Sequence, residues 1–326
     1  MTYHIAPLAP TPQELDGLSV RLIVSHYENN YGGAVRRLNA IQREFAALDV
    51  AKAPVFQING LKREELIAAN SMVLHEIYFD GLGKDGEGPS GALAAALERD
   101  FGSVQRWRAE FMAMGKALGG GSGWVLLTWF AAQGRLLNQW ASDHTQTLAG
   151  GQPVLALDMY EHAYQMDFGA NASAYVDATM RNINWAWAAQ RFEQLAHGAA
   201  PPKPLYGQGA LAPEDLRDAL AGAATGGVDA PRASGMPVLI DVRRKPAFDA
   251  SADMLPGAIW RAPEQIDAWA GELPKDRELL VYCVYGHNVS EDAAAELRRR
   301  GLKAKALRGG IAAWHAIGAP VQARGA

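Results

Sequence analysis

The sequence predicts two domains: an α-helical hairpin followed by an α/β half, and then a separate α/β domain with a parallel sheet. Helical periodicity dominates about the first ninety residues and then gives way to mixed helices and strands. After about residue 209, short apolar strands alternate with helices, a pattern typical of parallel sheets. The 326 residues are enough to give both domains a buried core.

In the first domain, long helices are expected first because apolar residues recur at helical spacing. From Pro89 onward, two helices lead through the glycine-rich turn GGGSG into apolar strands and a last helix. The expected helices are 18–30, 34–48, 63–82, 91–103, 104–118 and 173–196, and the expected strands are 124–130, 134–142 and 152–160.

A stretch rich in Pro, Gly and small residues, HGAAPPKPLYGQGA, marks the domain boundary. We expect a first domain at 1–196 (hairpin 1–88, α/β half 89–196), a linker at 197–208 and a second domain at 209–326. The second domain is expected to have a short helix at 213–220 and a flexible insertion at 221–235. Its expected strands are 237–242, 278–283 and 302–310, and its expected longer helices are 267–273 and 290–301.

Composition excludes several classes of protein. Residues 1–200 carry 15 Lys and Arg against 20 Asp and Glu, and residues 201–326 carry 16 against 15, so neither part predicts a nucleic-acid partner. No apolar stretch is long enough to cross a membrane, and the first residues do not resemble a secretion signal, so a cytoplasmic protein is expected. The single cysteine excludes an internal disulfide and a thiolate-rich metal site.

Three histidines and one aspartate form a candidate metal site. Asp158 and His162 stand four residues apart just after a strand, in LDMYEHAY, so both side chains can reach one ion. His26 and His75 lie on expected helices. Three neutral imidazoles with one carboxylate suit iron, manganese or zinc. The alternative is that these are ordinary histidines with hydrogen bonds in a helical core.

Residues 1–196 resemble the iron/manganese superoxide dismutase family. The resemblance rests on His26 twelve residues before Leu38-Asn39, LHEIYF around His75, GSGW at 121–124, DMYEHAY at 158–164 and NINW at 182–185. It implies the family fold, a helical hairpin followed by an α/β half. It also implies that His26, His75, Asp158 and His162 bind one iron or manganese ion, with iron favoured, and that superoxide is converted to dioxygen and hydrogen peroxide.

The resemblance is incomplete around the expected site. Family members usually carry a His four residues after the first ligand and a Tyr four residues further on, where this sequence has Asn30 and Ala34. On a regular α-helix the nearby Tyr31 would point about 140° away from His26, with a turn distorted by Gly32 and Gly33 as the alternative. Tyr160 replaces the usual Trp of the ligand motif. His144 is expected to take the outer-sphere role of hydrogen bonding to the metal-bound solvent.

The family resemblance also implies an oligomer. Glu161 resembles the glutamate that reaches the partner subunit's ligand histidine, here His162, and Tyr164 resembles an adjoining interface residue whose usual His partner is Asn30. A homodimer is therefore expected, with a tetramer left open. The substitutions Asn30 and Ala34 also support an alternative function, a metal-binding sensor or binding protein with impaired dismutation. A metal hydrolase ranks lower, because no separate general base is evident near the ligands.

Cys283 is the candidate reactive residue of the second domain. It ends the strand ELLVY and begins the loop VYGHNV, and Ser290 is the expected N-cap of the following helix. Such a loop is expected to direct backbone N–H groups at the sulfur and to stabilise an anion there, including a persulfide. The alternative is a buried structural cysteine, which is common for a lone one.

Residues 209–322 resemble the rhodanese-like sulfurtransferases, on LIDVR, LPGAI, VYCVYGHNVS and GGIAAWHAIGAPV. The resemblance implies that Cys283 accepts a sulfane sulfur and passes it to a thiol or cyanide. Asn288 replaces the Arg that usually ends the loop, which favours a small-molecule persulfide donor over thiosulfate, with thiol sensing or protein interaction as alternatives. The residues implied for the loop and its support are Gly286, His287, Asn288, Asp241 and Arg243.

Overall fold

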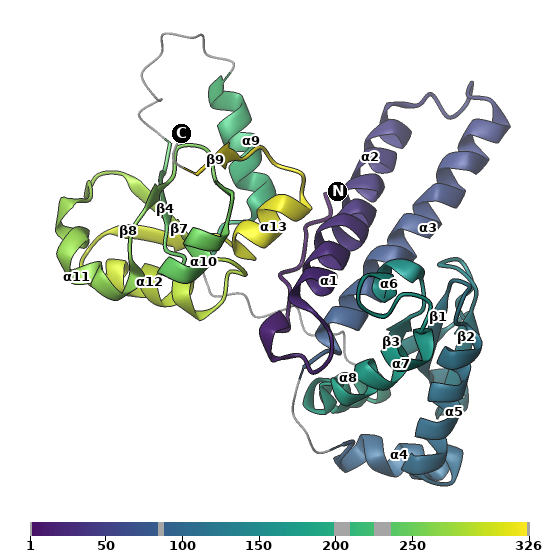
Figure 1. Ribbon diagram of the computed structural model, residues 1–326. Coiled ribbons are helices and arrows are strands. Elements are labelled where there is room, and N and C mark those ends of the chain that lie inside the picture. The colour runs from purple at the N-terminus through teal and green to yellow at the C-terminus, as the bar shows by residue number, and fades with distance from the viewer. Residues whose placement is uncertain (1, 84–87, 199–208, 225–235, 325–326) are drawn as a thin grey trace. The chain divides into compact units, whose positions relative to one another are not determined.

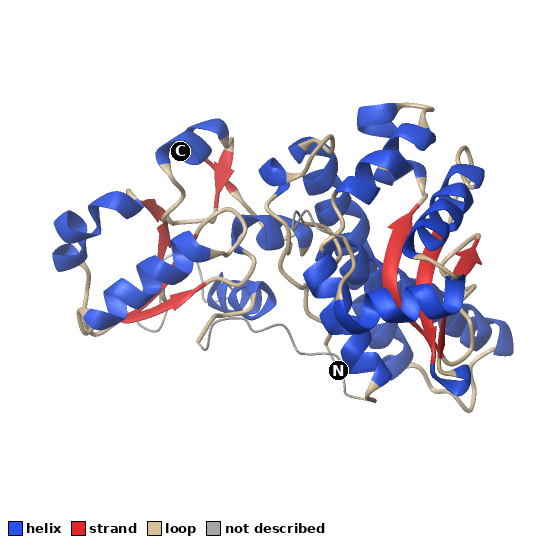
Figure 2. Ribbon diagram, turned by 90° about the horizontal axis from the view of Figure 1, so that it is seen from below, coloured by secondary structure: helices blue, strands red, loops and turns tan. Residues whose placement is uncertain are grey.

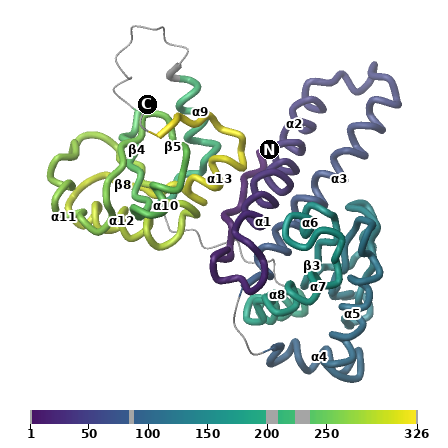
Figure 3. The backbone as a smooth tube through the Cα atoms, viewed as in Figure 1, coloured from purple at the N-terminus to yellow at the C-terminus, as the bar shows by residue number. Residues whose placement is uncertain are grey.

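A computed structural model of the protein describes residues 2–83, 88–198, 209–224 and 236–324. The chain divides into two compact units, traced as a tube in Figure 3. The first unit comprises Met1–Tyr3 and Ala9–Lys203, and the second comprises His4–Leu8 and Pro204–Ala326. Most of the expected linker and of the expected insertion lies outside the described residues.

The first unit begins with a helical hairpin (Figure 1). Helix α1 (Val20–Ser25) continues through a π-helical turn (His26–Tyr31) into α2 (Gly32–Ala47), and α3 (Val55–Asp80) returns alongside α2. Helix α3 begins about two turns before the expected start at residue 63. Gly60 in the added part costs about 1 kcal/mol relative to Ala, which a helix of 26 residues tolerates.

The α/β half of the first unit is built on an antiparallel sheet with strand order β2-β1-β3, drawn in red in Figure 2. Helices α3, α5 and α8 pack against this sheet. The strands follow the predicted apolar segments closely, and β1 is buried along almost all its length. The elements are α4 (Gly91–Phe101), α5 (Val104–Ala117), β1 (Trp124–Phe130), β2 (Arg135–Ala141), β3 (Gly151–Asp158), α6 (Gln165–Phe168), α7 (Ala172–Arg181) and α8 (Trp185–Ala196).

The last helix of this unit is interrupted, whereas the sequence predicts one helix over 173–196. Ile183 pairs with Leu82 in an isolated antiparallel bridge, which takes the chain out of the helix. Asn184 then starts α8, because its side chain accepts a hydrogen bond from the backbone N–H of Trp187. The expectation of one continuous helix was wrong because a tertiary contact outweighs helix propensity there.

The second unit contains a parallel sheet with strand order β6-β4-β7-β8, as alternating strands and helices predict. A separate antiparallel pair joins β5 to β9. Helix α12 packs against β7 and β8. The elements are α9 (Pro213–Ala224), β4 (Val238–Asp241), α10 (Lys245–Ala250), β5 (Asp253–Met254), β6 (Ile259–Trp260), α11 (Ile266–Trp269), β7 (Glu278–Tyr282), α12 (Asn288–Arg299), β8 (Lys303–Ala306), α13 (Gly310–Ala316) and β9 (Gln322–Ala323).

The core of the second unit lies between this sheet and its helices. Ile240, Leu279 and Val281 of the central strands pack with Leu297 of α12, and Cys283 belongs to the same buried cluster. The carboxyl ends of β4 and β7 lie side by side, so the residues that end these strands meet at one edge of the sheet. In the part of the chain that is described, no helix is both long and apolar enough to cross a membrane.

Candidate functional site

The structure brings the four predicted metal ligands together. His26 begins the π-helical turn, His75 lies on α3, Asp158 ends β3, and His162 lies on a short 3-10 turn (Glu161–Ala163). Each offers one ligand atom, and these atoms all lie within 4.8 Å of one another. His26, His75 and Asp158 are buried, and 26% of the His162 side chain is exposed.

The three imidazoles converge on one carboxylate oxygen. The Nε2 atoms of His26, His162 and His75 lie 3.1, 3.2 and 3.5 Å from Oδ2 of Asp158. His75 Nδ1 lies 2.7 Å from the backbone carbonyl of Ser71, which can only accept, so Nδ1 carries the proton and Nε2 has a lone pair. That buried Nε2 has no hydrogen-bond partner among the described residues. A cation between these atoms satisfies both the lone pair and the carboxylate, so the set fits a metal ion.

The electrostatics of the cluster favour neutral rings at His26 and His75 beside an ionised aspartate. Burial lowers the pKa of His75 to about 3, and burial also lowers the pKa of His26 although Asp158 acts in the opposite direction. Burial would raise the pKa of Asp158, but the charge of His162 and the hydrogen bonds from His162 and His26 outweigh it, so the pKa is held below its usual value. Neutral imidazoles and a carboxylate are the forms that bind metal.

His144 lies beside this cluster, close to where the sequence places an outer-sphere residue. Its ring centroid is 6.2 Å from that of His75, and it stacks on Tyr160 at 4.8 Å. Trp124 Nε1 donates a hydrogen bond of 3.0 Å to His144 Nδ1. Because Nδ1 accepts and burial lowers the pKa of His144, the neutral ring carries its proton on Nε2. Tyr160 in turn stacks on His162, at 5.4 Å.

The sulfur of Cys283 lies at the amino end of α12, and the residue is 6% exposed. Its hydrogen-bond partners among the described residues are the hydroxyl of Ser290, at 3.2 Å, and the backbone carbonyl of His287, at 3.8 Å. The expected backbone N–H groups are not among them. Ser290 is not the N-cap either: α12 begins at Asn288, and Ser290 faces inward from the third position of the helix. The expectation was wrong because the helix starts earlier.

Gly286 is required in the sulfur loop. Its φ is +74°, and a Cβ there would lie 2.3 Å from the backbone nitrogen of Gly309. The backbone that leads into α13 therefore approaches the loop more closely than any side chain permits. Ile311 N–H also donates to the carbonyl of Cys283, at 3.0 Å, which joins α13 to the base of the loop. Asn288, by contrast, is exposed at the start of α12.

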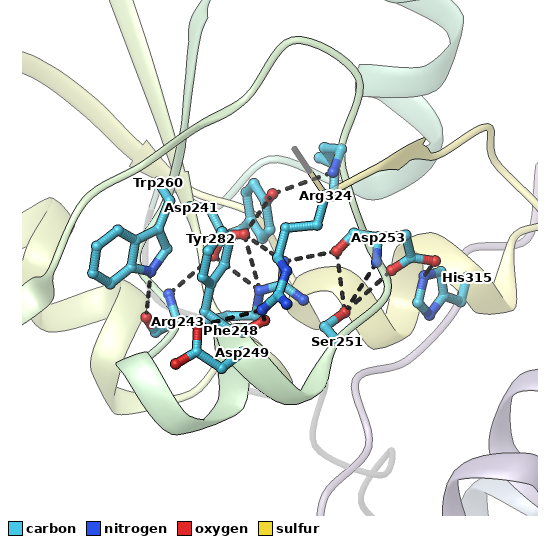
Figure 4. Close-up of polar contacts among 11 residues, drawn as sticks. Asp241, Arg243, Phe248, Asp249, Ser251, Asp253, Trp260, Tyr282, His315 and Arg324 are labelled. Atoms are coloured by element: carbon cyan, nitrogen blue, oxygen red, sulfur yellow. Dashed lines mark hydrogen bonds and ion pairs between the residues drawn. The ribbon is translucent and has the colours of Figure 1, made fainter. Parts of the chain in front are cut away.

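Asp241, Arg243 and Tyr282 form a buried polar network at the carboxyl ends of β4 and β7 (Figure 4). Arg243 donates from Nη2 to Asp241 Oδ2 at 2.6 Å, and from Nε at 2.9 Å to the same oxygen and 3.0 Å to Oδ1. The Tyr282 hydroxyl donates to Oδ2 at 3.0 Å. Burial, followed by the Asp241 carboxylate, raises the pKa of Tyr282 well above its usual range, so the hydroxyl keeps its proton. Because Tyr282 precedes Cys283, the network fixes the end of β7.

Comparison with known proteins finds matches for both parts of the chain. Residues 89–191 match the family of iron/manganese superoxide dismutases, C-terminal domain. A superoxide dismutase [Fe] from Cupriavidus metallidurans is 70% identical over 192 residues, which are 59% of this chain and 97% of that protein. The chain belongs to the iron/manganese superoxide dismutase family. Residues 226–317 match the rhodanese-like domain, so the chain also contains a rhodanese-like domain.

More distant superoxide dismutases are named for either metal. One from Aquifex aeolicus, named for iron, is 35% identical over 190 residues, covering 56% of this chain and 88% of that protein. One from Halobacterium salinarum, named for manganese, is 32% identical over 195 residues, covering 58% of this chain and 96% of that protein. The family therefore includes both metals, and the relative with the highest identity of these three is named for iron.

The π-helical turn remodels the part of the dismutase pocket where the sequence departs from the family. Tyr31 was expected to point away from His26, but its ring is buried and its centroid is 6.4 Å from that of His75. A π-turn contains an extra residue, which rotates Tyr31 toward His75. Its hydroxyl donates to Glu76 Oε1 at 2.8 Å. Ala34 is buried and leaves no polar group at its position.

Glu76 is a site residue that the sequence analysis missed. Burial raises its pKa to about 7, against the opposing hydrogen bond from Tyr31. The sequence does contain a sign of this role, because Glu76 directly follows His75 and is a charged residue among the mostly apolar residues of this part of the helix. Tyr164 is 2% exposed and packs against Tyr175, while Glu161 is exposed. Contacts of Glu161, Tyr164 and Asn30 with a partner subunit stay predictions.

Proposed function

We propose that the first unit dismutes superoxide at one iron or manganese ion bound by His26, His75, Asp158 and His162, with iron favoured. The observation that carries this proposal is the convergence of three Nε2 atoms on one buried carboxylate oxygen. Iron is favoured because the relative at 70% identity is a superoxide dismutase [Fe]. When bound, the metal supplies one-electron redox chemistry with superoxide.

The residues of this chain provide the surroundings for that chemistry. Asp158 contributes the one carboxylate of the set, which balances part of the metal's charge. His144 holds a proton on Nε2 because Trp124 occupies its Nδ1. Burial raises the pKa of Tyr160 to about 12, so its hydroxyl also keeps its proton near neutral pH. His144 can therefore donate a hydrogen bond from Nε2 to oxygen species that reach the centre, while the Tyr160 hydroxyl is hydrogen-bonded to the backbone of His144.

Elemental analysis paired with a superoxide-consumption assay on the same preparation tests this proposal. We expect activity proportional to iron or manganese content, and we expect His162→Ala to lose both metal and activity. The matched control is His197→Ala, an exposed histidine after α8, which should keep both. A protein with a full complement of iron or manganese but no activity above that of free metal would contradict the dismutase proposal.

That contrary result would favour the second candidate, a metal-binding sensor or binding protein with impaired dismutation. The observation behind it is the pocket itself: Asn30 and Ala34 stand where the family usually has His and Tyr, and the Tyr31 hydroxyl is engaged by Glu76. For this candidate, metal binding survives in the wild type and is lost in His162→Ala, while superoxide consumption is absent from both.

A homodimer is part of the proposal for the first unit. The His162 side chain is the most exposed of the four ligands, and Glu161 beside it is exposed, so a partner's carboxylate has access to this ligand. Sedimentation of the wild type and Glu161→Gln over a range of concentrations tests this. The variant should dissociate at higher concentration than the wild type, whereas Glu44→Gln, at an exposed site on α2, should not.

For the second unit, we propose that Cys283 carries a persulfide. Its thiolate attacks the sulfane sulfur of a small-molecule persulfide, the donor's S–S bond breaks, and the donor leaves as a thiolate that takes up a proton. An acceptor thiolate then attacks the outer sulfur and releases the Cys283 thiolate, so no net oxidant is needed. Ser290 can turn its hydroxyl from the His287 carbonyl, at 3.3 Å, to the sulfur, at 3.2 Å, and so stabilise the anion.

Mass spectrometry after incubation with a low-molecular-weight persulfide tests the second proposal. We expect a mass increase of one sulfur atom on Cys283, removable by a thiol, and a several-fold slower gain in Ser290→Ala, since one hydrogen bond to a charged sulfur is lost. Cys283→Ser is the control for labelling elsewhere. Wild-type protein that gains no sulfur on Cys283 from any donor would overturn the transferase proposal.

A further inference from the structure

A short segment far from the second unit in sequence is part of that unit. Residues His4–Leu8 belong to it, although residues 9–203 form the first unit. Two apolar side chains anchor the segment, because Ile5 and Leu8 are each 1% exposed. The backbone N–H of Ile5 also donates to Oε1 of Glu214, near the start of α9, at 2.8 Å. The rhodanese-like unit is therefore assembled from two separate parts of the chain.

This segment reaches the sulfur loop. The Leu8 carbonyl lies 2.9 Å from Nε2 of His287, the fifth residue of the loop Cys283–Asn288. A carbonyl can only accept, so Nε2 of His287 is the donor. Pro7 lies against Gly309, since a Cβ on that glycine would be 3.5 Å from the Cα of Pro7. Residues 4–8 therefore contact the loop directly through His287. They also contact Gly309, whose backbone packs on Gly286 within the loop.

The contacts continue from His287 to the reactive atom. The backbone carbonyl of His287 lies 3.3 Å from the Ser290 hydroxyl and 3.8 Å from the Cys283 sulfur. The same hydroxyl lies 3.2 Å from the sulfur. The position of His287 therefore sets the hydrogen bonds of the sulfur. Its ring is fixed by Leu8, and its carbonyl faces the sulfur.

We propose that residues 4–8 form a strap that positions the loop Cys283–Asn288 through His287 and keeps the sulfur covered. The strap lies outside residues 226–317, the part that matches the rhodanese-like domain. His287 is a positioning residue in this arrangement. The consequence for sulfur transfer rests on the persulfide function proposed above, but the strap itself is testable without it.

The experiment measures the rate at which iodoacetamide alkylates Cys283 in the full-length, metal-loaded protein. Releasing the strap with the double variant Ile5→Ser, Leu8→Ser should raise this rate about three- to tenfold, because Cys283, a residue that is 6% exposed, becomes accessible. His287→Ala leaves both anchors in place and removes only the ring donor, and it should raise the rate in the same direction. Val321→Ser, an exposed site in the same unit, is the matched control and should leave the rate unchanged.

Hydrogen exchange of the β7 amides, measured on the same samples, establishes that the second unit stays folded. If the double variant unfolds the unit, His287→Ala decides the matter alone. Rates equal to the wild type in both variants would overturn the proposal, and so would acceleration in the double variant with none in His287→Ala. A missing persulfide on wild-type Cys283 would instead count against the sulfurtransferase proposal and leave the alkylation result standing.

Discussion

The substitution Asp241→Asn removes the charge at the centre of the buried network at the carboxyl ends of β4 and β7. Arg243 is 2% exposed and Asp241 is fully buried, so neither charge can be compensated by water when the other is lost. The asparagine amide would replace one carboxylate oxygen. With its N–H₂ group at the position of Oδ2, it would place N–H groups against Nη2 of Arg243. With the amide flipped, the contacts made by Oδ1 would be lost instead.

The expected cost follows from these contacts. Oδ2 of Asp241 accepts from Arg243 Nη2 at 2.6 Å, from Nε at 2.9 Å and from the Tyr282 hydroxyl at 3.0 Å. Breaking a buried ion pair from one side costs about 3–5 kcal/mol, because the remaining charge stays buried without its partner. A unit of this size has a free energy of unfolding of about 5–15 kcal/mol, so Asp241→Asn should remove a large part of it.

Hydrogen exchange in increasing urea measures this change in the second unit alone, from the amides of β4 and β7. Asp249→Asn is the matched control, because its pair with Lys245 is 49% and 60% exposed and should be worth less than about 1 kcal/mol. The double variant Asp241→Asn, Arg243→Gln removes both charges and should cost less than the two single changes together. A loss in Asp241→Asn no larger than in Asp249→Asn would refute the reasoning.

Three further predictions concern the first unit. A Cβ on Gly123 would lie 2.0 Å from a backbone carbonyl oxygen of β2, so Gly123→Ala should lower the melting temperature by several degrees more than Gly120→Ala, where the space is open. In metal-free protein, burial lowers the pKa of His75 to about 3, whereas its ordinary value is 6.5, so the unfolded chain binds one more proton between these pH values. The free energy of unfolding should therefore fall as the pH drops below about 6.5, and it should fall less steeply in His75→Gln. Trp124→Phe removes the hydrogen-bond donor to His144 Nδ1, so the rate of superoxide consumption should fall, by up to about tenfold, at unchanged metal content. An unchanged rate would show that this hydrogen bond has no role.

The sequence carried the information for most of both folds and for the grouping of His26, His75, Asp158 and His162. Strand segments such as Trp124–Phe130 are continuous apolar runs between turn residues, and Asp158 and His162 have a spacing that reports directly on geometry. The misses share a cause. The break at Ile183 depends on pairing with Leu82, and the inward position of Tyr31 depends on a π-turn, neither of which a local pattern contains.

The sulfur loop illustrates the same limit. Its type and length were readable from VYCVYGHNVS, but the partners of the Cys283 sulfur were not. Ser290 reads as an N-cap because Ser is favoured at that position, yet the helix begins earlier and turns the hydroxyl inward. The contact between Leu8 and His287 joins residues 279 positions apart, and no periodicity or motif links them.

Because the strap and the rest of its unit are far apart in the sequence, the ribosome synthesises them at different times. Residues 4–8 are made before residues 9–203 of the first unit, and residues 204–326 are made after them. At about 5–20 residues per second, the roughly two hundred residues between them take about 10–40 s to synthesise. During that interval the rest of the second unit, to which Ile5 and Leu8 belong, has not yet been made. The dismutase unit can therefore fold before residues 4–8 join their own unit. The rhodanese-like unit is completed only after translation has passed its last strands.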